Sequence, residues 1–567
     1  MLAILDGKDG RLVFGAPSAL IRADGPEQVP QALAALEAAR AAGKWLAGYF
    51  SYELGYVLEK RLVPCLPADL ATPLMLFGVY DSPSDTLPPA TGRAYAGPLT
   101  PEWDAAAYGG CFAAVKEAIA AGDIYQANLS FRAGFAFVGD PRALYEQLRM
   151  ASQAPYCAFL DYGDQRSGRA RQIVSLSPEL FFEIERGVIR ARPMKGTLKR
   201  GEDDGAERAV LAASAKDRAE NLMIVDLIRN DLGRVAEIGS VAVADLFAVE
   251  TYPTLHTMVS TVAARLKQAA SIADIVTALF PCGSITGAPK IRAMEILREL
   301  ESSPRGAYCG AIGFFAPDGS ARFNVAIRTL TITGNRGTLG VGGGVVQDSK
   351  EAAEYAECLL KARFFEAARD PLQLIETLKF EGDFVRLARH LARMARSAKL
   401  FGLDFDPGRA RKALEDAVAG QAGALRVRLT LDEQGLLQAC SAKLAPNPPH
   451  WTFVLSPECS WSGDELLRHK ISWRQMYESE AVRLKADEVI FRNELGEVTE
   501  GARSNVFVRR GGKLLTPPIF SGLLPGILRA ELIENGKCEE AVLNEADLAG
   551  EVYFGNSLRG LIPAKPI

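Results

Sequence analysis

The stretch RPMKGT, residues 192–197, decides which fold and which chemistry this sequence predicts. A proline and a glycine flank Lys195 within four residues, which is typical of a tight, ordered segment. Glu179 stands sixteen residues upstream, in the stretch SPEL at 177–180. A lysine in a loop is most often a solvated cation, so the sequence around Lys195 has to decide its role.

The length and composition of the chain are those of a multidomain globular protein. A chain of 567 residues is too long for one hydrophobic core, which predicts two or more domains. Hydrophobic residues make up 48% and charged residues 24%, as in ordinary globular proteins. The net charge of −4 argues against a nucleic-acid surface. We find no apolar run long enough to span a bilayer and no cleavable signal, so we expect no membrane segment.

The cysteines and histidines restrict the compartment and the metal chemistry. Nine cysteines are scattered along the chain without a Cys-x-x-Cys pair. This spacing argues against a disulfide framework or a structural zinc site, and it fits a reducing compartment. Four histidines exclude a histidine-rich metal site. We therefore expect a cytoplasmic protein.

The pattern of apolar residues predicts alternating strands and helices in two regions. Residues 206–232 are predicted as one long helix, and residues 350–368 as the last helix of the first region. The Asp370-Pro371 pair then stops the helix, because proline disfavours helical backbone in the residue before it. After this break the pattern restarts with a hairpin and a helix. We predict an α+β protein with two domains, residues 1–368 and residues 369–567.

Two acidic clusters in the first region suggest a metal site. Glu220 lies on a predicted helix, and residues 348–357, which end in Glu357, open another helix directly after three glycines. Mg²⁺ prefers oxygen ligands and is usually held by one or two carboxylates together with an anionic substrate. A solvated or ion-paired helix face is the alternative, and spacing alone leaves both open.

A series of long motifs between residues 45 and 365 resembles the chorismate-utilising enzymes. That resemblance implies a fold of antiparallel sheets packed with helices. The motifs are GDIYQANLS (122–130), SPEL (177–180), PMKGT (193–197), RAENLMIVDLIRNDLGRVAEIGSV (218–241), GSITGAPK (283–290), AIRTLTI (326–332) and GGGVVQDS (342–349).

The residue at position 195 selects the reaction within this family. Family members that make anthranilate, isochorismate or salicylate typically have alanine there, whereas those that make aminodeoxychorismate have a nucleophilic lysine. The resemblance therefore implies Mg²⁺-dependent amination of chorismate with ammonia to 4-amino-4-deoxychorismate, through a covalent bond to Lys195. Glu179 is the expected general acid for the departing C4 hydroxyl, and such an acid needs a raised pKa.

The same resemblance implies the remaining residues of the first site. His256 is expected near the departing hydroxyl, and Glu220 and Glu357 are expected to bind Mg²⁺. An arginine fork and backbone N–H groups suit the carboxylates of chorismate. The residues implied in substrate binding are Thr197, Tyr308, Arg328, Gly343, Gly344 and Lys361.

The source of ammonia is not evident in the sequence. No segment resembles a glutamine amidotransferase with its nucleophilic cysteine in a Gly-x-Cys-x-Gly turn. We expect the chain to use free ammonia or to associate with a separate glutamine amidotransferase subunit.

The C-terminal region resembles the fold-type IV pyridoxal-phosphate enzymes, in five stretches between residues 390 and 560. The resemblance implies an α+β domain that binds pyridoxal 5'-phosphate, with Lys470 as the Schiff-base lysine. A carboxylate would hold the pyridine nitrogen, and an arginine and a helix start would hold the phosphate. The implied cofactor-binding residues are Arg393, Lys470, Glu500, Ile527, Leu528, Asn556 and Ser557.

Two departures bear on the activity of this second region. Leu528 replaces a threonine common in the aminotransferases, which removes one hydroxyl from the phosphate site. The Asn556-Ser557 pair, where aminotransferases have Gly-Thr-Ala, is more similar to the lyases. We therefore expect elimination of pyruvate to give 4-aminobenzoate, a folate precursor. The region has fewer than 200 residues, which leaves open a homodimer through this domain.

Three alternatives remain open. The first is an anthranilate synthase component I, against which Lys195 argues. The second makes the C-terminal region a non-catalytic module that stabilises the synthase or docks the glutaminase. The third makes it a D-amino-acid or branched-chain aminotransferase.

Overall fold

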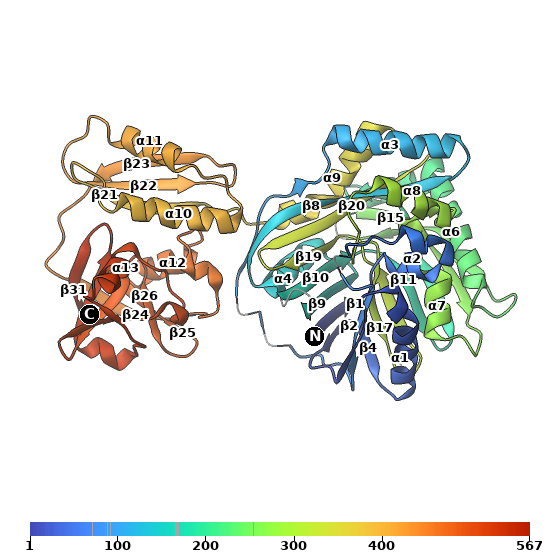
Figure 1. Ribbon diagram of the computed structural model, residues 1–567, viewed down its shortest axis with the longest axis horizontal. Coiled ribbons are helices and arrows are strands. Elements are labelled where there is room, and N and C mark those ends of the chain that lie inside the picture. The colour runs from blue at the N-terminus through green and yellow to red at the C-terminus, as the bar shows by residue number, and fades with distance from the viewer. Residues whose placement is uncertain (71, 88, 91, 165–168, 253–254) are drawn as a thin grey trace. The chain divides into compact units, whose positions relative to one another are not determined.

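The computed structural model describes residues 1–567 except 71, 88, 91, 165–168 and 253–254 (Figure 1). No helix in this described part is long and apolar enough to cross a membrane. Helices pack with largely antiparallel sheets throughout, which confirms the predicted α+β multidomain class. The chain forms two compact units: Met1–Pro88, Leu99–Gly134 and Tyr145–Ala368 make the first, and Pro89–Pro98, Phe135–Leu144 and Arg369–Ile567 make the second.

Two short segments of the N-terminal half therefore belong to the second unit. Tyr95 and Val138 are fully buried there, in one apolar cluster with Leu374 and Phe401. The rings of Tyr95 and Phe401 lie 5.0 Å apart in an edge-on arrangement. Burial of these apolar side chains, and not the order of the chain, decides which unit they join.

Two ten-stranded sheets form the framework of the first unit, although β6 and the end of β8 lie in segments of the second unit. The first sheet has the order β16-β8-β20-β19-β10-β9-β1-β2, with β6 and β7 paired to β8. Its strands are β1 (Leu2–Gly7), β2 (Gly10–Phe14), β6 (Ala94–Ala96), β7 (Thr100–Pro101), β8 (Gln126–Gly139), β9 (Tyr156–Asp164), β10 (Arg169–Ser177), β16 (Gly287–Ala288), β19 (Thr329–Thr333) and β20 (Arg336–Val345).

The second sheet has the order β13-β15-β12-β11-β18-β17-β4-β5-β3, with β14 paired to β15. A large apolar core covers one of its faces and includes buried phenylalanines such as Phe50, Phe77 and Phe323. Its strands are β3 (Ala19–Ala23), β4 (Trp45–Phe50), β5 (Met75–Tyr80), β11 (Leu180–Glu185), β12 (Val188–Arg192), β13 (Met194–Lys199), β14 (Ala242–Thr251), β15 (Leu255–Arg265), β17 (Ala311–Phe315) and β18 (Ala321–Val325).

The stretch predicted as one helix over residues 206–232 is two helices, and that prediction was wrong. The helices are α5 (Asp204–Ala213) and α6 (Ala215–Gly233). Ser214 between them has an extended backbone, and its hydroxyl accepts a hydrogen bond from the backbone N–H of Asp217. A serine that caps a helix start in this way ends one helix and begins the next.

The other helices of the first unit lie along the two sheets (Figure 1). Helix α9 packs against β20 of the first sheet. Helix α6 packs against β15 of the second sheet, which also contains the strand of Lys195. These helices are α1 (Val29–Ala41), α2 (Leu54–Leu58), α3 (Ala105–Ala120), α4 (Pro141–Ser152), α7 (Ile272–Leu279), α8 (Lys290–Leu300) and α9 (Glu351–Ala368).

The second unit contains two sheets. The smaller sheet has the order β21-β22-β23, and helices α10 and α11 pack on it. The larger sheet has the order β26-β25-β24-β31-β30-β27-β28-β29. The elements are β21 (Leu374–Phe380), α10 (Leu387–Phe401), α11 (Pro407–Val418), β22 (Leu425–Leu431), β23 (Leu437–Lys443), β24 (Trp451–Ser460), α12 (Gln475–Leu484), β25 (Glu488–Asn493), β26 (Val498–Gly501), β27 (Asn505–Arg510), β28 (Lys513–Thr516), α13 (Ile527–Glu534), β29 (Glu539–Glu540), β30 (Glu551–Asn556) and β31 (Gly560–Pro566).

Candidate active sites

Lys195 lies on the edge strand β13, opposite Met258 of β15. The register of this pair shifts between Lys195 and Thr197, and Gly196 between them has a φ of +76°. A side chain at Gly196 would be strained at this φ and would also meet the Asp217 carboxyl group. A bulge of this kind redirects the neighbouring side chains, which explains why glycine follows the lysine.

Ser284 links Lys195 to Glu179. The Ser284 hydroxyl donates to Glu179 Oε1 at 2.8 Å, and the Ser284 carbonyl accepts from Lys195 Nζ at 3.4 Å. Glu179 is buried, with 4% of its surface exposed, and Ser284 is buried as well. Sequence reasoning missed Ser284, although it lies in the GSITGAPK motif at 283–290.

Burial changes the pKa of both groups in the directions that acid–base chemistry requires. Desolvation raises the pKa of Glu179 to about 7, against the opposing effects of the Ser284 hydrogen bond and the Lys195 charge. Desolvation also lowers the pKa of Lys195, although the Glu220 and Glu179 carboxylates act against it. Near neutral pH, Glu179 can therefore hold a proton, and Lys195 loses its proton more readily than a free lysine.

The two predicted metal ligands, Glu220 and Glu357, lie on separate helices, and both are near Lys195. Glu220 of α6 and Glu357 of α9 both act electrostatically on Lys195. Burial raises the pKa of Glu220, and its nearest ion-pair partner is Lys216 at 3.8 Å. Glu357 pairs with Lys361 at 2.9 Å. Two carboxylates that both act on Lys195, one of them weakly paired, fit the oxygen ligand set of Mg²⁺.

A third carboxylate lies in the same neighbourhood. Glu354, one helical turn before Glu357, is buried and contributes to the raised pKa of Glu220. Its Oε1 accepts from the Ser349 hydroxyl at 2.7 Å. This hydrogen bond fixes the start of α9 directly after the glycines of β20.

Most of the residues predicted to bind the substrate's carboxylates lie on or beside β20. Burial lowers the pKa of Arg328, whose guanidinium lies over the Phe364 ring. Such a cation is suited to an incoming anion.

Lys361 donates to the Gly342 carbonyl at 3.0 Å. Tyr308 is buried against Gly340, where a Cβ would overlap its ring. Thr197 is exposed on β13.

Gln126 is a second residue that sequence reasoning missed. It is fully buried on β8, and neither its amide nitrogen nor its amide oxygen has a partner among the described residues. A Cβ built on Gly344 would lie 3.0 Å from Gln126 Nε2 and 3.6 Å from Lys195 Nζ. A buried amide without partners costs free energy unless a ligand satisfies it. The only indication in the sequence was that Gln126 belongs to the motif GDIYQANLS.

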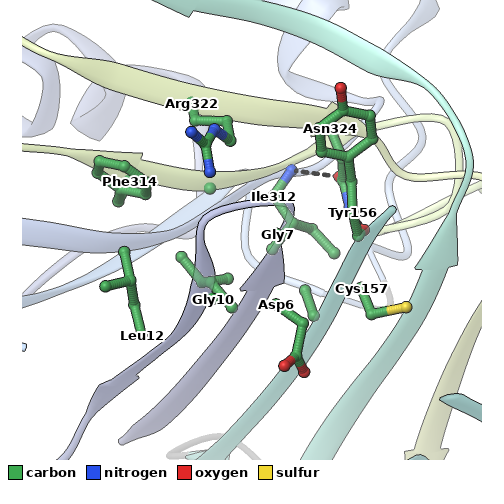
Figure 2. Close-up of a pocket in the computed structure, with 13 residues that line it drawn as sticks. Asp6, Gly7, Gly10, Leu12, Tyr156, Cys157, Ile312, Phe314, Arg322 and Asn324 are labelled. Carbon is green, nitrogen blue, oxygen red and sulfur yellow. Dashed lines mark hydrogen bonds between the residues drawn. The ribbon is translucent and has the colours of Figure 1, made fainter. Parts of the chain in front are cut away.

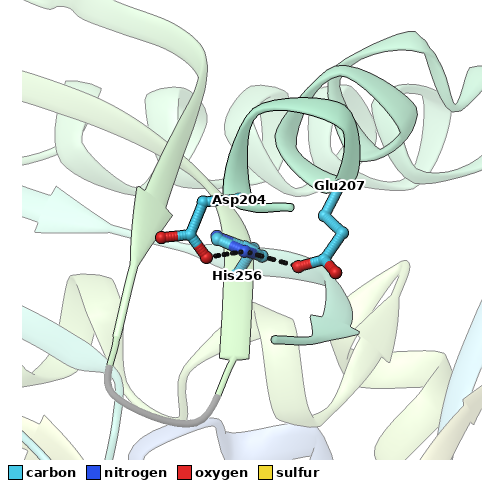
Figure 3. Close-up of side chains that lie close together, drawn as sticks. All are labelled: Asp204, Glu207 and His256. Atoms are coloured by element: carbon cyan, nitrogen blue, oxygen red, sulfur yellow. Dashed lines mark hydrogen bonds and ion pairs between the residues drawn. The ribbon is translucent and has the colours of Figure 1, made fainter. Parts of the chain in front are cut away.

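His256 has a different environment from the one expected near Lys195. Its Nε2 lies 3.1 Å from Glu207 Oε2 and 3.3 Å from Asp204 Oδ1, and both acids come from α5 (Figure 3). Its Nδ1 lies 2.9 Å from the Thr251 hydroxyl. The contacts described for His256 are thus with these residues and not with Lys195.

A small cavity elsewhere in the first unit is not a substrate site. It has a volume of about 30 Å³ and lies between β1, β9 and β17 (Figure 2). This volume holds little more than a water molecule or two. Asn324 closes one side, where its Oδ1 accepts from the Ile312 N–H at 3.1 Å. None of the predicted site residues lines it.

In the second unit, Arg393 of α10 is held by Glu376, which sequence reasoning missed. Glu376 accepts from Arg393 Nε at 2.8 Å and from Nη2 at 2.7 Å, and it lies 2.6 Å from His390 Nδ1. Arg393 Nη1 also donates to the Pro525 carbonyl at 3.3 Å, just before α13. Burial raises the pKa of Glu376, but the Arg393 charge and the His390 hydrogen bond lower it to about 2.

Lys470 lies in the same electrostatic neighbourhood. Burial, together with the charges of Arg474 and Arg393, lowers its pKa to about 8. The backbone carbonyl of Lys470 accepts from the Ile375 N–H at 2.8 Å, which ties the lysine to β21. An amine with this pKa is partly neutral near physiological pH, as a Schiff-base lysine requires.

The other predicted residues of the second unit surround the start of α13. Glu500 accepts from the Tyr477 hydroxyl at 2.9 Å and from the Leu524 N–H at 3.1 Å. Ile527 and Leu528 are buried in the first turn of α13. Asn556 and Ser557 form hydrogen bonds with residues outside this turn. The Asn556 amide donates to the Arg503 carbonyl at 3.4 Å, and the Ser557 hydroxyl lies 2.8 Å from His390 Nε2.

These residues fit a pyridoxal phosphate site by their chemistry. Lys470, Arg393 and Glu500 supply an amine, a cation suited to a phosphate and a carboxylate, and both Arg393 and Glu500 act electrostatically on Lys470. The start of an α-helix offers free backbone N–H groups to a phosphate.

Comparisons with known proteins agree with the two units. The family model described as chorismate binding enzyme matches residues 5–367, and the model for amino-transferase class IV matches residues 373–567. The predicted resemblance to both families is confirmed.

Individual relatives cover mainly the first region. Aminodeoxychorismate synthase component 1 of Klebsiella aerogenes is 43% identical over 343 residues, which is 55% of this chain and 74% of the relative. The protein of the same name from Escherichia coli (strain K12) is 46% identical over 268 residues, 46% of this chain and 57% of the relative.

A solved structure supports the fold of the first region. Anthranilate synthase component I from Streptococcus pneumoniae TIGR4 aligns with a TM-score of 0.52 and 25% identity, over 64% of this chain and 89% of that one. The chain is an enzyme that belongs to the chorismate binding family and carries a second region of the class IV aminotransferase type.

Proposed function

We propose that the first unit aminates chorismate to 4-amino-4-deoxychorismate through a covalent bond to Lys195. The observation that carries this proposal is the Lys195–Ser284–Glu179 arrangement, in which one serine contacts both an amine of lowered pKa and a carboxyl group of raised pKa. The relatives named aminodeoxychorismate synthase component 1 support it.

The chemistry follows from the protonation states of these two side chains. The neutral amine of Lys195 forms a bond to C2 of the ring while the C4–oxygen bond breaks, and the proton of Glu179 leaves with the hydroxyl as water. Ammonia then forms a bond to C4, and the bond between C2 and Lys195 breaks, which restores the free amine. Covalent catalysis of this kind divides one difficult displacement into two easier ones.

Glu220 and Glu357 would hold Mg²⁺ in this reaction. When bound, Mg²⁺ would neutralise and anchor a carboxylate of chorismate. Arg328 and the Gly343 and Gly344 amides would hold the substrate's other anionic group. The side-chain amide of Gln126, which has no partner in the protein part described, would form hydrogen bonds with the bound reactants. His256 would reach the departing hydroxyl only after separating from Asp204 and Glu207.

Mass spectrometry and product analysis test the synthase proposal. With chorismate, ammonium and Mg²⁺, the protein is expected to form 4-amino-4-deoxychorismate and a covalent substrate adduct at Lys195. Lys195→Ala should lose both, while the exposed Lys267→Ala should lose neither. An alanine variant at 195 with full activity and no adduct in the parent protein would rule out the nucleophile. Production of anthranilate would favour the alternative family member.

For the second unit we propose pyridoxal-phosphate-dependent elimination of pyruvate from aminodeoxychorismate, which yields 4-aminobenzoate. Bound pyridoxal phosphate would supply the electron sink for this elimination. Lys470 would attach the cofactor and carry the proton, Glu500 would face the pyridine nitrogen, and Arg393 with the start of α13 would hold the phosphate. The match to the class IV model and the lowered pKa of Lys470 support this assignment.

Absorption spectroscopy separates a cofactor enzyme from a non-catalytic module. After incubation with pyridoxal phosphate, the protein should show a visible absorption band that Lys470→Ala abolishes and the exposed Lys443→Ala retains. A colourless protein with full synthase activity would favour the module. Pyruvate as a product favours the lyase, whereas keto-acid-dependent amino transfer favours an aminotransferase.

We propose that the first unit receives its ammonia from a partner chain. The words "component 1" in the relatives' names support a separate glutamine amidotransferase that supplies ammonia. Glutamine should then replace ammonium only when that second subunit is present. A homodimer through the second unit remains a prediction, and sedimentation of the pure protein would test it.

A further inference from the structure

Asp204, Glu207 and His256 form a compact cluster outside the proposed magnesium site. One ligand atom from each lies within 4.8 Å of the others. In Figure 3 the two carboxyl groups of α5 lie on either side of the His256 ring of β15, and both face the same nitrogen. The three residues therefore offer one imidazole nitrogen and two carboxylate oxygens to a common point.

The spacing of these atoms fits a metal coordination shell. Zn²⁺ binds histidine nitrogen at about 2.0–2.1 Å and carboxylate oxygen at about 2.0–2.2 Å in tetrahedral sites. Ligand atoms at the corners of such a tetrahedron lie about 3.3–3.5 Å apart. The His256 nitrogen lies 3.1 Å and 3.3 Å from the two carboxylate oxygens. Small rotations of these side chains would complete three corners and leave the fourth for water.

The second nitrogen of His256 provides an independent observation. It lies 2.9 Å from the Thr251 hydroxyl, which belongs to neither α5 nor the cluster. A metal-bound histidine usually donates its other ring N–H to an oxygen, and this bond fixes the ring and the tautomer. His256 is also fully buried.

We propose that this cluster is a binding site for a transition-metal dication, with Zn²⁺ as the representative ion. A nitrogen ligand disfavours Mg²⁺, which takes oxygen, and favours zinc and its neighbours. The site is thereby distinct in chemistry from the carboxylates Glu220 and Glu357.

Two neighbouring groups compete with the metal for the same carboxylates. Arg200 donates to both oxygens of Asp204, at 2.8 and 2.7 Å, and the Gly201 N–H donates to Glu207 Oε2 at 2.9 Å. Removing the guanidinium frees Asp204 and removes a positive charge beside the ion. Arg200→Gln should therefore bind Zn²⁺ more tightly than the parent protein.

Occupation of the site would fasten α5 to β15 and engage His256. Since the proposed function requires His256 to reach the substrate, Zn²⁺ bound here would inhibit the synthase reaction. This consequence rests on the proposed function, but metal binding at the cluster does not.

Isothermal titration with ZnCl₂ in the presence of saturating Mg²⁺ tests the site on the full-length protein. One Zn²⁺ should bind per chain. Asp204→Asn and Glu207→Gln should each weaken that event at least tenfold, because each removes one of three ligands. Thr251→Val should weaken it by about 10–100-fold, the usual effect of losing an outer hydrogen-bond partner. Glu202→Gln, an exposed acid of the same segment, is the matched control and should bind as the parent does.

The outcomes separate the proposal from its alternatives. Zinc binding that is unchanged in both Asp204→Asn and Glu207→Gln would place the ion elsewhere and overturn the proposal, as would no zinc binding by the parent protein. Binding that follows the variants without inhibition of amination would keep the site and refute the catalytic role of His256. Inhibition that disappears in the same two variants would support both.

Discussion

The hydroxyl of Ser284 is expected to set the pH range in which Glu179 can act as an acid. It donates to Glu179 Oε1 at 2.8 Å, and this hydrogen bond stabilises the charged carboxylate. The bond therefore opposes burial, which raises the pKa of Glu179 to about 7. Replacement of Ser284 by alanine removes the opposing effect, so the pKa of Glu179 should rise further.

The size of the change follows from the strength of the bond. A hydrogen bond to a charged group contributes about 1.5–3 kcal/mol, and one pKa unit corresponds to about 1.36 kcal/mol. Ser284→Ala should thus raise the pKa of Glu179 from about 7 to about 8–9. Because the acid works in its protonated form, the alkaline limb of the activity profile should move to higher pH by the same amount.

The assay is kcat/KM for chorismate against pH, with Mg²⁺ saturating and the concentration of free ammonia held constant. Ser303→Ala is the matched control, because it removes a hydroxyl that donates to the exposed Glu102 carboxylate at 2.6 Å. Its profile should coincide with that of the parent protein. An alkaline limb that stays in place in Ser284→Ala, or moves to lower pH, would refute the role given to this hydrogen bond.

Two further predictions concern buried positions. Glu376→Gln should cost about 3–5 kcal/mol of the free energy of unfolding at neutral pH, measured by denaturant titration, because it leaves Arg393 buried without its carboxylate. Since the pKa of Glu376 is lowered to about 2, the parent's stability advantage should be full above pH 4.5 and disappear as the pH falls toward 2; a difference independent of pH would contradict this. Gly340→Ala should cost about 1–3 kcal/mol and raise KM for chorismate, because its Cβ would overlap the Tyr308 ring. Gly110→Ala on α3 meets open space and should be neutral or slightly stabilising, so equal losses in both variants would count against the steric argument.

Much of the architecture was predictable because it depends on local signals. Motifs with fixed spacing identified both regions, and the Asp370-Pro371 break lies next to the change between the two compact units. The break between α5 and α6 was missed, although Ser214 followed by Asp217 is a recognisable helix-start pattern. Apolar periodicity continues through that serine and hid the signal.

The site was harder to predict, because its residues come from distant parts of the chain. Lys195 and Glu179 stand out within short motifs, but nothing local indicates that Ser284 contacts both. Glu376 looks like an ordinary strand residue, and only the return of α10 over β21 brings Arg393 to it. The partners of His256 also depend on where α5 folds back, which no spacing in the sequence specifies.

The two short segments that join the second unit have a practical consequence for anyone who wishes to separate the two units. A fragment that starts at Arg369 would lack Tyr95, whose buried ring packs on Phe401 and also lies 6.2 Å from the ring of Trp473. Such a fragment would expose apolar surface to water and invite aggregation. Exchange of this unit between proteins would therefore need to carry residues 89–98 and 135–144 along, because a single cut at residue 369 leaves part of its apolar core behind.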